Sequence, residues 1–252
     1  MLQVEAVTKK FDDLVALDKV DLFLKQGRSL ALIGPAAAGK SVLLKCLVGL
    51  YAPSEGVIRI DGQEVGTAAQ RPKALSHRIG MLFQQNALFD SLTVWENIAF
   101  RLMADGMGRR AARAQAEALL PKVGLPEENA ILTPADLSGG MQKRVAIARA
   151  IVMNPKYLFC DEPNSGLDPK TAIIIDNLIQ EITEEFQITT VINTHDMNSV
   201  MEIGQKIIFL ENGTKAWEGD KEEIFVTDNK AVGNFVYSSE LFKKVRATYQ
   251  KK

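Results

Sequence analysis

The stretch Gly34-Pro35-Ala36-Ala37-Ala38-Gly39-Lys40-Ser41 decides the fold of this chain. It follows the pattern of a glycine, four residues, a second glycine, a lysine and a serine or threonine. An apolar run at 29–33 precedes it, and residues 42–50 after it have helical spacing. A strand, a glycine loop and a helix in this order are typical of an α/β nucleotide-binding unit.

This loop has the chemistry of a phosphate site. Its backbone N–H groups can form a concave nest for an anion, backed by the positive end of the following helix. Lys40 would supply a point charge to the β- and γ-phosphates, and the Ser41 hydroxyl is a hard oxygen ligand suited to Mg²⁺. The alternative is an ordinary glycine turn. Because strand, spacing and helix agree, we predict a phosphate site made by Gly34, Pro35, Ala36, Ala37, Ala38, Gly39, Lys40, Ser41 and Val42.

The composition limits the classes of protein to consider. The chain has 252 residues, enough for one large domain or two small ones. Its net charge is −1, which excludes a strongly basic nucleic-acid coat. The two cysteines, Cys46 and Cys160, cannot make a disulfide scaffold, so we expect a reducing compartment.

No membrane or targeting segment is recognisable. No apolar run approaches the about 18 residues that a membrane span needs. The start at 1–5 lacks the basic residues and the apolar stretch of a signal peptide. We therefore predict a soluble, cytoplasmic chain that reaches a membrane only through a partner.

Apolar runs and amphipathic stretches alternate along the chain. We predict strands at 2–7, 20–24, 29–33, 57–60, 157–160, 188–193 and 206–210, and helices at 42–50, 95–103, 111–120, 138–150 and 171–186. No β-run occurs between about 91 and 153, which predicts an inserted helical subdomain at about 88–152. Asn212-Gly213 predicts a terminal hairpin within 204–217. The main domain would span 1–225, and 226–252 would be a tail.

Polar residues follow two predicted strands. The strand at 157–160 ends in Asp161 and Glu162. In a sheet, ligands gather at the carboxyl ends of strands, which places Asp161 beside a Mg²⁺ bound at the phosphate loop. Adjacent strand residues point apart, so Glu162 would instead polarise the attacking water. His195 follows the strand at 188–193 and could donate to the γ-phosphate. The alternatives are a solvated Asp-Glu-Pro turn and a structural histidine.

A second anion site is predicted far from the first. In the run 137–142, Ser138 is a good N-cap, and Gly139 and Gly140 leave backbone amides bare at a positive helix end. The alternative is an ordinary helix start. Two phosphate sites and one nucleotide favour a two-fold dimer in which each protomer's serine and glycines face the partner's Lys40.

Together these motifs resemble the ATP-binding subunits of ABC transporters over residues 2 to about 225. The resemblance covers the phosphate loop, Gln84 after 82–83, the run at 137–142, the carboxylates at 161–162, the turn at 165–168, and His195. It implies an α/β, RecA-like P-loop NTPase core with an antiparallel β-subdomain and an inserted α-helical subdomain. It also implies ATP and Mg²⁺ as cofactors.

The resemblance assigns roles residue by residue. Catalysis would involve Glu162, His195, Lys40 and Gln84, and the metal would be bound by Ser41, Gln84 and Asp161. Nucleotide contacts beyond the phosphate loop would be Phe11, Val15, Ser138, Gly139, Gly140, Asp161 and Asp168. Phe11 stands where the family stacks an aromatic ring on adenine; taken alone, it would be a core residue.

Within the family the sequence is most similar to the MlaF-like ATPases of phospholipid (Mla-type) transporters. The stretches 81–89, 137–144 and 160–169 carry this likeness. Ala37 stands where most relatives have glycine, and a positive φ there would cost about 1 kcal/mol. Val42 replaces a common threonine and removes a hydroxyl near the α-phosphate. Met141 replaces the usual glutamine, which we interpret as a subfamily mark.

The resemblance also implies partners. These are a second copy in a head-to-tail homodimer, a membrane permease and a lipid-binding subunit, with no nucleic acid. The chain would then lie on the inner face of the cell membrane through the permease. Part of the apolar stretch 87–95 would receive a permease helix, and the rest would be core. The basic residues at 109–113 are expected on a solvated helix face. The tail would be an inter-subunit clasp or a packed or frayed terminus.

The predicted function is an ATPase that powers phospholipid movement through a separate permease. The alternatives are import of a small polar solute or ion, a nontransport ABC ATPase, and a nucleotide-gated scaffold without turnover. Nontransport members usually have a fused second ATPase unit, long coiled coils or basic arms, which this chain lacks. Glu162 and His195 argue against a scaffold without turnover.

Overall fold

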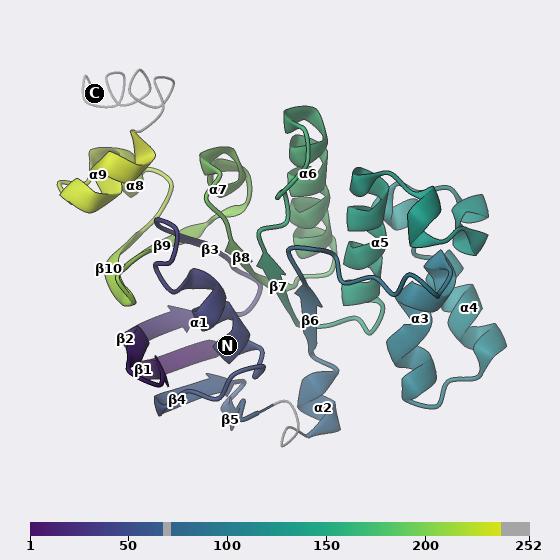
Figure 1. The fold of residues 1–252 in the computed structure, drawn as a ribbon, viewed down its shortest axis with the longest axis horizontal. Helices are drawn as coiled ribbons and strands as arrows, with labels where there is room; N and C mark the ends of the chain where they lie inside the picture. Colours follow the sequence, from purple (N-terminus) through teal and green to yellow (C-terminus); the bar gives the residue numbers. More distant parts are fainter. Residues whose placement is uncertain (68–71, 238–252) are drawn as a thin grey trace. The chain divides into compact units, whose positions relative to one another are not determined.

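The computed structural model describes residues 1–67 and 72–237. Contacts divide the chain into two compact units. The first comprises the described residues of Met1–Pro72 and Thr189–Lys252, and the second is Lys73–Ile188. Each unit is described by itself below (Figure 1).

The first unit contains an antiparallel sheet, as expected. Its strands are β1 (Leu2–Phe11), β2 (Leu14–Leu24), β4 (Glu55–Ile60) and β5 (Gln63–Glu64), in the order β2-β1-β4-β5. The strands β1 and β2 extend to the turn at 12–13, beyond the predicted 2–7 and 20–24. These ends were not predicted, because charged residues interrupt the alternation of apolar side chains near the turn.

The same unit also contains mostly parallel strands. These are β3 (Ser29–Ile33), β8 (Thr189–Asn193), β9 (Lys206–Glu211) and β10 (Thr214–Gly219), in the order β10-β9-β3-β8. All five residues of β3 and of β8 are buried, as expected for strands covered on both faces. The β9–β10 turn is Asn212-Gly213 with φ of 49° and 77°, which confirms the predicted hairpin. Helices α1 (Lys40–Leu47) and α7 (Met197–Ile203) follow β3 and β8.

The second unit is mainly helical. It comprises α2 (Lys73–Ser76), β6 (Ile79–Leu82), α3 (Val94–Ala104), α4 (Arg109–Glu117), α5 (Gly139–Ile151), β7 (Tyr157–Asp161) and α6 (Pro169–Glu185). Three 3₁₀ turns at Pro121–Val123, Glu127–Ile131 and Pro134–Asp136 connect α4 to α5. The stretch 91–153, described throughout, has no strand, as predicted. The parallel pair β6–β7 includes one strand that was not predicted, because β6 has four residues and contains Gly80.

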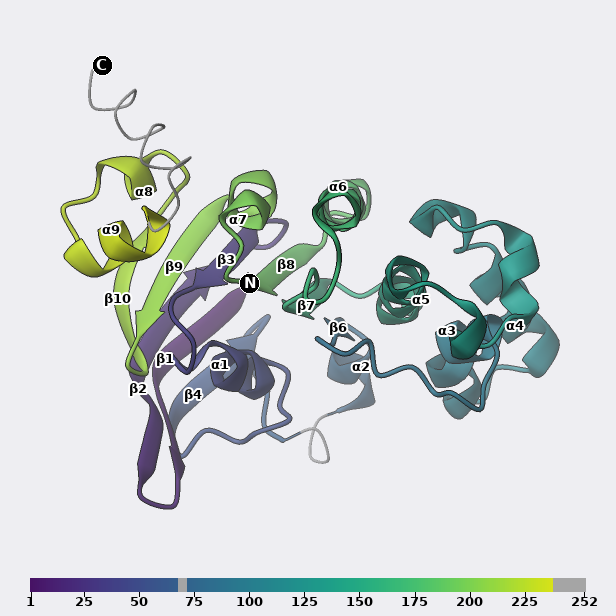
Figure 2. The ribbon, with the colours of Figure 1, turned by 45° about the horizontal axis from the view of Figure 1, so that its top comes forward.

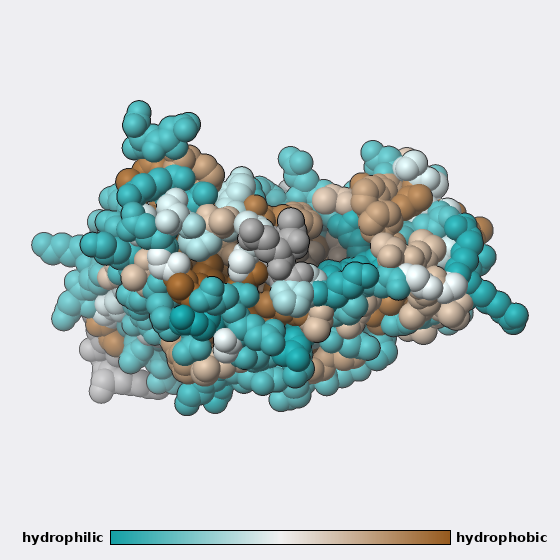
Figure 3. Space-filling model, turned by 90° about the horizontal axis from the view of Figure 1, so that it is seen from below, coloured by the Kyte–Doolittle hydropathy of each residue, from teal (hydrophilic) through white to brown (hydrophobic). Residues whose placement is uncertain are grey.

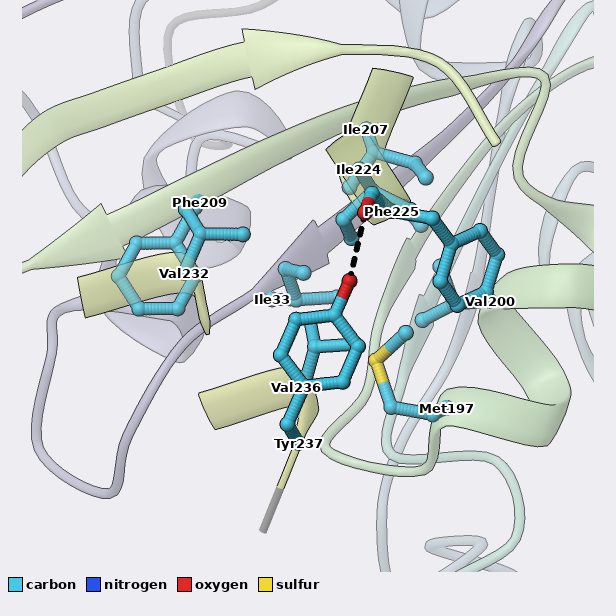
Figure 4. Packing of buried hydrophobic residues seen from close by; sticks show 11 residues of the cluster. Ile33, Met197, Val200, Ile207, Phe209, Ile224, Phe225, Val232, Val236 and Tyr237 are labelled. Carbon is cyan, nitrogen blue, oxygen red and sulfur yellow. Dashed lines mark hydrogen bonds between the residues drawn. The ribbon is translucent and has the colours of Figure 1, made fainter. Parts of the chain in front are cut away.

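The chain beyond 225 is not simply a tail. Helices α8 (Glu223–Val226) and α9 (Lys230–Val236) lie against β9 and β10 in Figures 1 and 2. Val232 and Val236 are fully buried in a cluster with Ile33, Phe209 and Met197 (Figure 4). The Tyr237 hydroxyl donates to the Phe225 carbonyl oxygen at 2.9 Å. Residues up to Tyr237 therefore belong to the core of the first unit, and the rest of the predicted clasp, 238–252, lies outside the described residues.

The face drawn in Figure 3 is largely hydrophilic, with hydrophobic residues in separate patches. Among the described residues, no helix combines the length and the apolar character needed to cross a bilayer. One exposed apolar pair is Phe89 and Phe100, 42% and 45% exposed, whose ring centroids lie 4.6 Å apart.

Because α9 is part of the core, replacing valine by alanine should lower the free energy of unfolding more at position 232 than at position 226. Val232→Ala should lower the free energy of unfolding by about 1–3 kcal/mol, because it removes buried methyl groups and leaves a cavity. Val226→Ala, at a position 57% exposed, should change it by less than about 0.5 kcal/mol. Urea denaturation of both variants measures the difference. Equal losses would mean that α9 does not contribute to the core.

Candidate functional site

The phosphate loop lies between the buried strand β3 and helix α1, where the sequence placed it. Gly34 has φ of 141°, and a Cβ there would lie 2.1 Å from the Leu210 carbonyl oxygen. Gly39 has φ of 97°, and its Cβ would lie 2.7 Å from the Ala16 carbonyl oxygen. Both positions therefore need glycine, and they bring the loop against β9 and β2.

Lys40 is the central cation of this loop and is 7% exposed. Its Nζ donates to the carbonyl oxygens of Gly34 at 2.8 Å and Pro35 at 2.9 Å. A buried ammonium group must be compensated by such bonds. The ammonium group is thus fixed across the inside of the loop, where it can meet phosphate oxygens.

The parallel pairing of β3 with β8 brings a second set of polar residues to the loop. Leu32 is in register with Asn193, the last residue of β8. The Asn193 side chain is fully buried, and its Nδ2 donates to the Ser41 Oγ at 3.0 Å. His195, exposed, follows two residues later, and Thr194 N donates to the Leu32 carbonyl oxygen at 3.1 Å. Asn193 was not predicted as a site residue; the available signal was a buried amide at a strand end.

Phe11 and Val15 lie next to the turn of the β1–β2 hairpin, which also contacts the loop through Ala16. The Phe11 ring is half-buried and packs edge-on against Tyr51, with 5.3 Å between centroids. The Lys9 Nζ lies 4.8 Å from the Phe11 ring centroid. Val15 is exposed, and Val42 is half-buried on α1. The residues of this unit fit a nucleotide in three respects: a glycine loop at the start of a helix, a cation held inside that loop, and a half-buried aromatic ring.

Ala37 has φ of 60°, a left-handed conformation that is unfavourable for alanine. The condition stated for the sequence is therefore met, and the cost of about 1 kcal/mol applies. Ala36 beside it is exposed and is not among the residues with positive φ.

In the second unit, β7 presents the paired carboxylates. Asp161 is the last residue of a fully buried strand. Glu162 follows with φ of 47° and is half-buried. A left-handed glutamate is uncommon, and such strain concentrates at functional sites. The turn then closes with Ser165 N donating to the Glu162 carbonyl oxygen at 3.1 Å.

Gln84 lies next to this turn within the second unit. Its Nε2 donates to the Ser165 Oγ at 3.3 Å. Its carbonyl oxygen accepts from the Nζ of Lys143, which lies on α5 and is 1% exposed. Burial lowers the pKa of Lys143 to about 8, and the electrostatic interaction with Cys160 opposes this shift. The Lys143 contact was not predicted, because no local pattern reveals the partner of a buried lysine.

The run at 137–142 begins helix α5, and the predicted N-cap is present. The Ser138 Oγ accepts from Met141 N at 3.3 Å. Ser138, Gly139 and Gly140 line a groove of about 670 Å³ with Gly166 and Asp168. Asp168 caps α6, and hydrogen bonds from the Thr171 hydroxyl and backbone lower its pKa. Gly139, Gly140 and Asp168 therefore lie on one concave surface.

The apolar stretch at 87–95 divides as expected. Val94 is fully buried and Trp95 is 5% exposed, while Phe89 is exposed. The basic residues at 109–113 are exposed, as expected. Arg109 stacks over the Trp95 ring at 4.7 Å and its Nη2 lies 2.6 Å from the Glu96 Oε1, so it covers an aromatic residue instead of only facing solvent.

The strain at Ala37 gives a prediction with a matched control. Ala37→Gly should raise the free energy of unfolding by up to about 1 kcal/mol, because glycine tolerates the left-handed conformation. Ala36→Gly should lower it by about 0.4–1 kcal/mol, because it only adds freedom to the unfolded chain. Urea denaturation checks both, and nucleotide titration follows ATP affinity. A loss of stability in Ala37→Gly equal to that in Ala36→Gly would contradict the prediction.

Comparison with known proteins adds an independent line of evidence. The ABC transporter family profile matches residues 17–165. The methionine import ATP-binding protein MetN of Desulfitobacterium hafniense is 38% identical over 237 residues, which are 92% of this chain and 69% of that protein. The probable sulfate/thiosulfate import ATP-binding protein CysA of Chlorella vulgaris is 38% identical over 88% of this chain and 92% of its own length.

A solved structure agrees with these relatives. The dimeric ATP-binding cassette MJ0796 bound to ADP and Pi has a TM-score of 0.77 and 35% identity, over 87% of this chain and 98% of that chain. The named relatives are importers, so they support the family but not the MlaF-like subfamily. The predicted fold class is confirmed. This chain belongs to the ABC transporter ATP-binding family, whose members couple ATP hydrolysis to transport.

Proposed function

We propose that two copies of this chain bind and hydrolyse ATP to power transport through a separate membrane permease. The observation that carries the proposal is the phosphate loop, where Lys40 is fixed by two loop carbonyl oxygens between β3 and α1. The loop amides and Lys40 would bind the phosphates of ATP. Phe11 would stack on the base, with Val15 beside it.

The residues of the second unit would act on the terminal phosphate. Glu162 would orient the attacking water, and His195 of the first unit would donate to the γ-phosphate. Ser41, Asp161 and Gln84 supply oxygen ligands of the kind that Mg²⁺ prefers. When bound, Mg²⁺ neutralises charge that develops on the phosphates. Support comes from the buried position of Asp161 and from the turn that joins Gln84, Ser165 and Glu162.

A two-fold dimer would complete each site. The groove lined by Ser138, Gly139, Gly140 and Asp168 is concave and includes the start of α5, which is the positive end of that helix. We propose that it faces the phosphate loop of the partner copy, so that each nucleotide lies between two chains. The solved relative MJ0796 is dimeric, which supports this arrangement.

The permease would contact the exposed pair Phe89 and Phe100. Asn97, fully buried on α3, fixes the backbone here by accepting from Phe89 N at 2.8 Å and donating to the Phe89 carbonyl oxygen at 3.1 Å. Two adjacent exposed aromatic rings on a fixed backbone are typical of a protein contact surface. Through this contact the chain would lie at the inner face of the membrane. We also propose the helical subdomain at about 88–152, while the ATPase domain extends beyond the predicted boundary at 225 because α8 and α9 belong to the core of the first unit.

For the cargo, we favour import of a small polar solute. Both named relatives are importers, of methionine and of sulfate or thiosulfate. Phospholipid movement, with a lipid-binding subunit, is the second candidate. It rests on Met141 and on the stretches 81–89, 137–144 and 160–169.

The two cargoes can be separated by one experiment. The native complex would be purified from membranes, placed in vesicles, and assayed for ATP hydrolysis and for movement of methionine, sulfate or labelled phospholipid. We expect one of the small solutes to be moved at the expense of ATP. Movement of phospholipid alone would overturn the importer proposal and leave the ATPase proposal intact.

The role of Glu162 predicts a loss of turnover without a loss of binding. Glu162→Gln should lower kcat by about 10²–10⁴-fold, because the amide cannot polarise water, while ATP still binds. The matched control is Glu181→Gln on the exposed face of α6, which should leave phosphate release unchanged. Phosphate release and nucleotide titration are the measurements. Near-normal turnover of Glu162→Gln would remove Glu162 from this role.

A further inference from the structure

Two cationic side chains of helix α5 bind the backbone of the loop that contains Gln84. The Lys143 Nζ donates to the Gln84 carbonyl oxygen at 3.0 Å. The Arg149 guanidinium donates to the carbonyl oxygens of Ala87 at 2.6 Å and Asn86 at 2.5 Å. Both ends of this four-residue segment are therefore attached to α5, the helix whose N-cap is Ser138.

The attachment depends on a buried cation, and burial of a charged group costs free energy. Lys143 is 1% exposed, and burial lowers the pKa of its side chain and that of Arg149. A well-packed apolar side chain of similar volume is often at least as stabilising as a buried charge. The lysine is therefore better explained by what its ammonium group binds than by stability alone.

The bound loop has a conformation that it would not adopt unaided. Asn86 and Ala87 are consecutive non-glycine residues with φ of 60° and 50°. Each is disfavoured in the left-handed region, alanine more than asparagine. The buried Asn86 Oδ1 also has no hydrogen-bond partner among the described residues. Contacts from outside the loop must therefore maintain this conformation.

We infer that Lys143 and Arg149 are positioning residues for ATP hydrolysis, which fix the Gln84 loop to α5 so that Gln84 and the Ser138-Gly139-Gly140 turn move together. This inference rests on the proposed function of both elements. A conformational change of the Gln84 loop on nucleotide binding would then reach the Ser138-Gly139-Gly140 turn through α5.

The consequence for the reaction follows from the next contacts along the chain. Gln84 donates to the Ser165 Oγ, and the Ser165 N donates to the Glu162 carbonyl oxygen. Release of the Gln84 backbone would therefore shift a metal ligand and loosen the turn that carries the general base. A displacement of about 1 Å at such groups can cost up to about 10²-fold in rate.

The test compares Lys143→Met, which keeps the volume but removes the donor, with Lys143→Gln, whose amide can still donate. Lys143→Met should lower kcat about tenfold and raise the Mg²⁺ concentration for half-maximal hydrolysis several-fold. Its KM for ATP should stay within about twofold, because the phosphate loop is untouched. Lys143→Gln should recover most of the rate.

A second readout does not depend on activity. The amide of Asn86 donates to the Phe83 carbonyl oxygen at 3.1 Å, so its hydrogen exchange reports the loop conformation. Exchange at 84–88 should be faster in Lys143→Met and in Arg149→Met than in the wild type. The control is Lys221→Met, which loses a comparable bond to the Glu202 carbonyl oxygen in the other unit and should change neither readout.

The outcomes separate the inference from the proposed function. Unchanged exchange at 84–88 and an unchanged Mg²⁺ requirement in Lys143→Met would overturn the inference while the wild type still hydrolyses ATP. A lower unfolding midpoint with neither change would show a purely structural role, which also overturns it. If the wild type hydrolysed no ATP, the proposed function would fail, and the exchange experiment would still decide whether the two cations fix the loop.

Discussion

The structure depends first on the contact of the Lys40 ammonium group with the carbonyl oxygens of Gly34 and Pro35. This contact fixes the phosphate loop from inside, while the missing side chains of Gly34 and Gly39 let β9 and β2 approach its outer surface. Substitution at either glycine would force backbone atoms apart. The loop, two strands of different sheets and the start of α1 are thus one rigid assembly around a single cation.

Much of this assembly was predictable because its signals are local. The run at 29–33 is apolar throughout and ends at a glycine, and the structure gives β3 these bounds. The hairpin at Asn212-Gly213 followed from a two-residue pattern. By contrast, β6 is too short for periodicity to be read, and α9 was not predicted because its buried valines contact β3 and β9, about 200 and about 25 residues earlier in the chain.

The candidate site shows the same division. Its motif residues were recognised because chemistry fixes their spacing along the chain. Asn193 and Lys143 were missed because their partners, Ser41 and Gln84, are 152 and 59 residues away. A hydrogen bond to a backbone carbonyl oxygen cannot be recognised from the acceptor residue in the sequence, since any residue type supplies the same oxygen. The sequence therefore indicates candidate side chains for nucleotide binding more readily than the side chains that hold them in position.

The two kinds of backbone strain in this chain have different consequences. At Ala37 the strain lies inside a loop already fixed by Lys40, so it lowers stability without giving the loop a second conformation. At Asn86 and Ala87 the strain lies in a loop attached by hydrogen bonds from another element, so loss of those bonds frees it. Strain maintained from outside can couple two elements, because each is stable in its present form only while the other is in place. That difference makes the Gln84 loop better suited than the phosphate loop to change conformation.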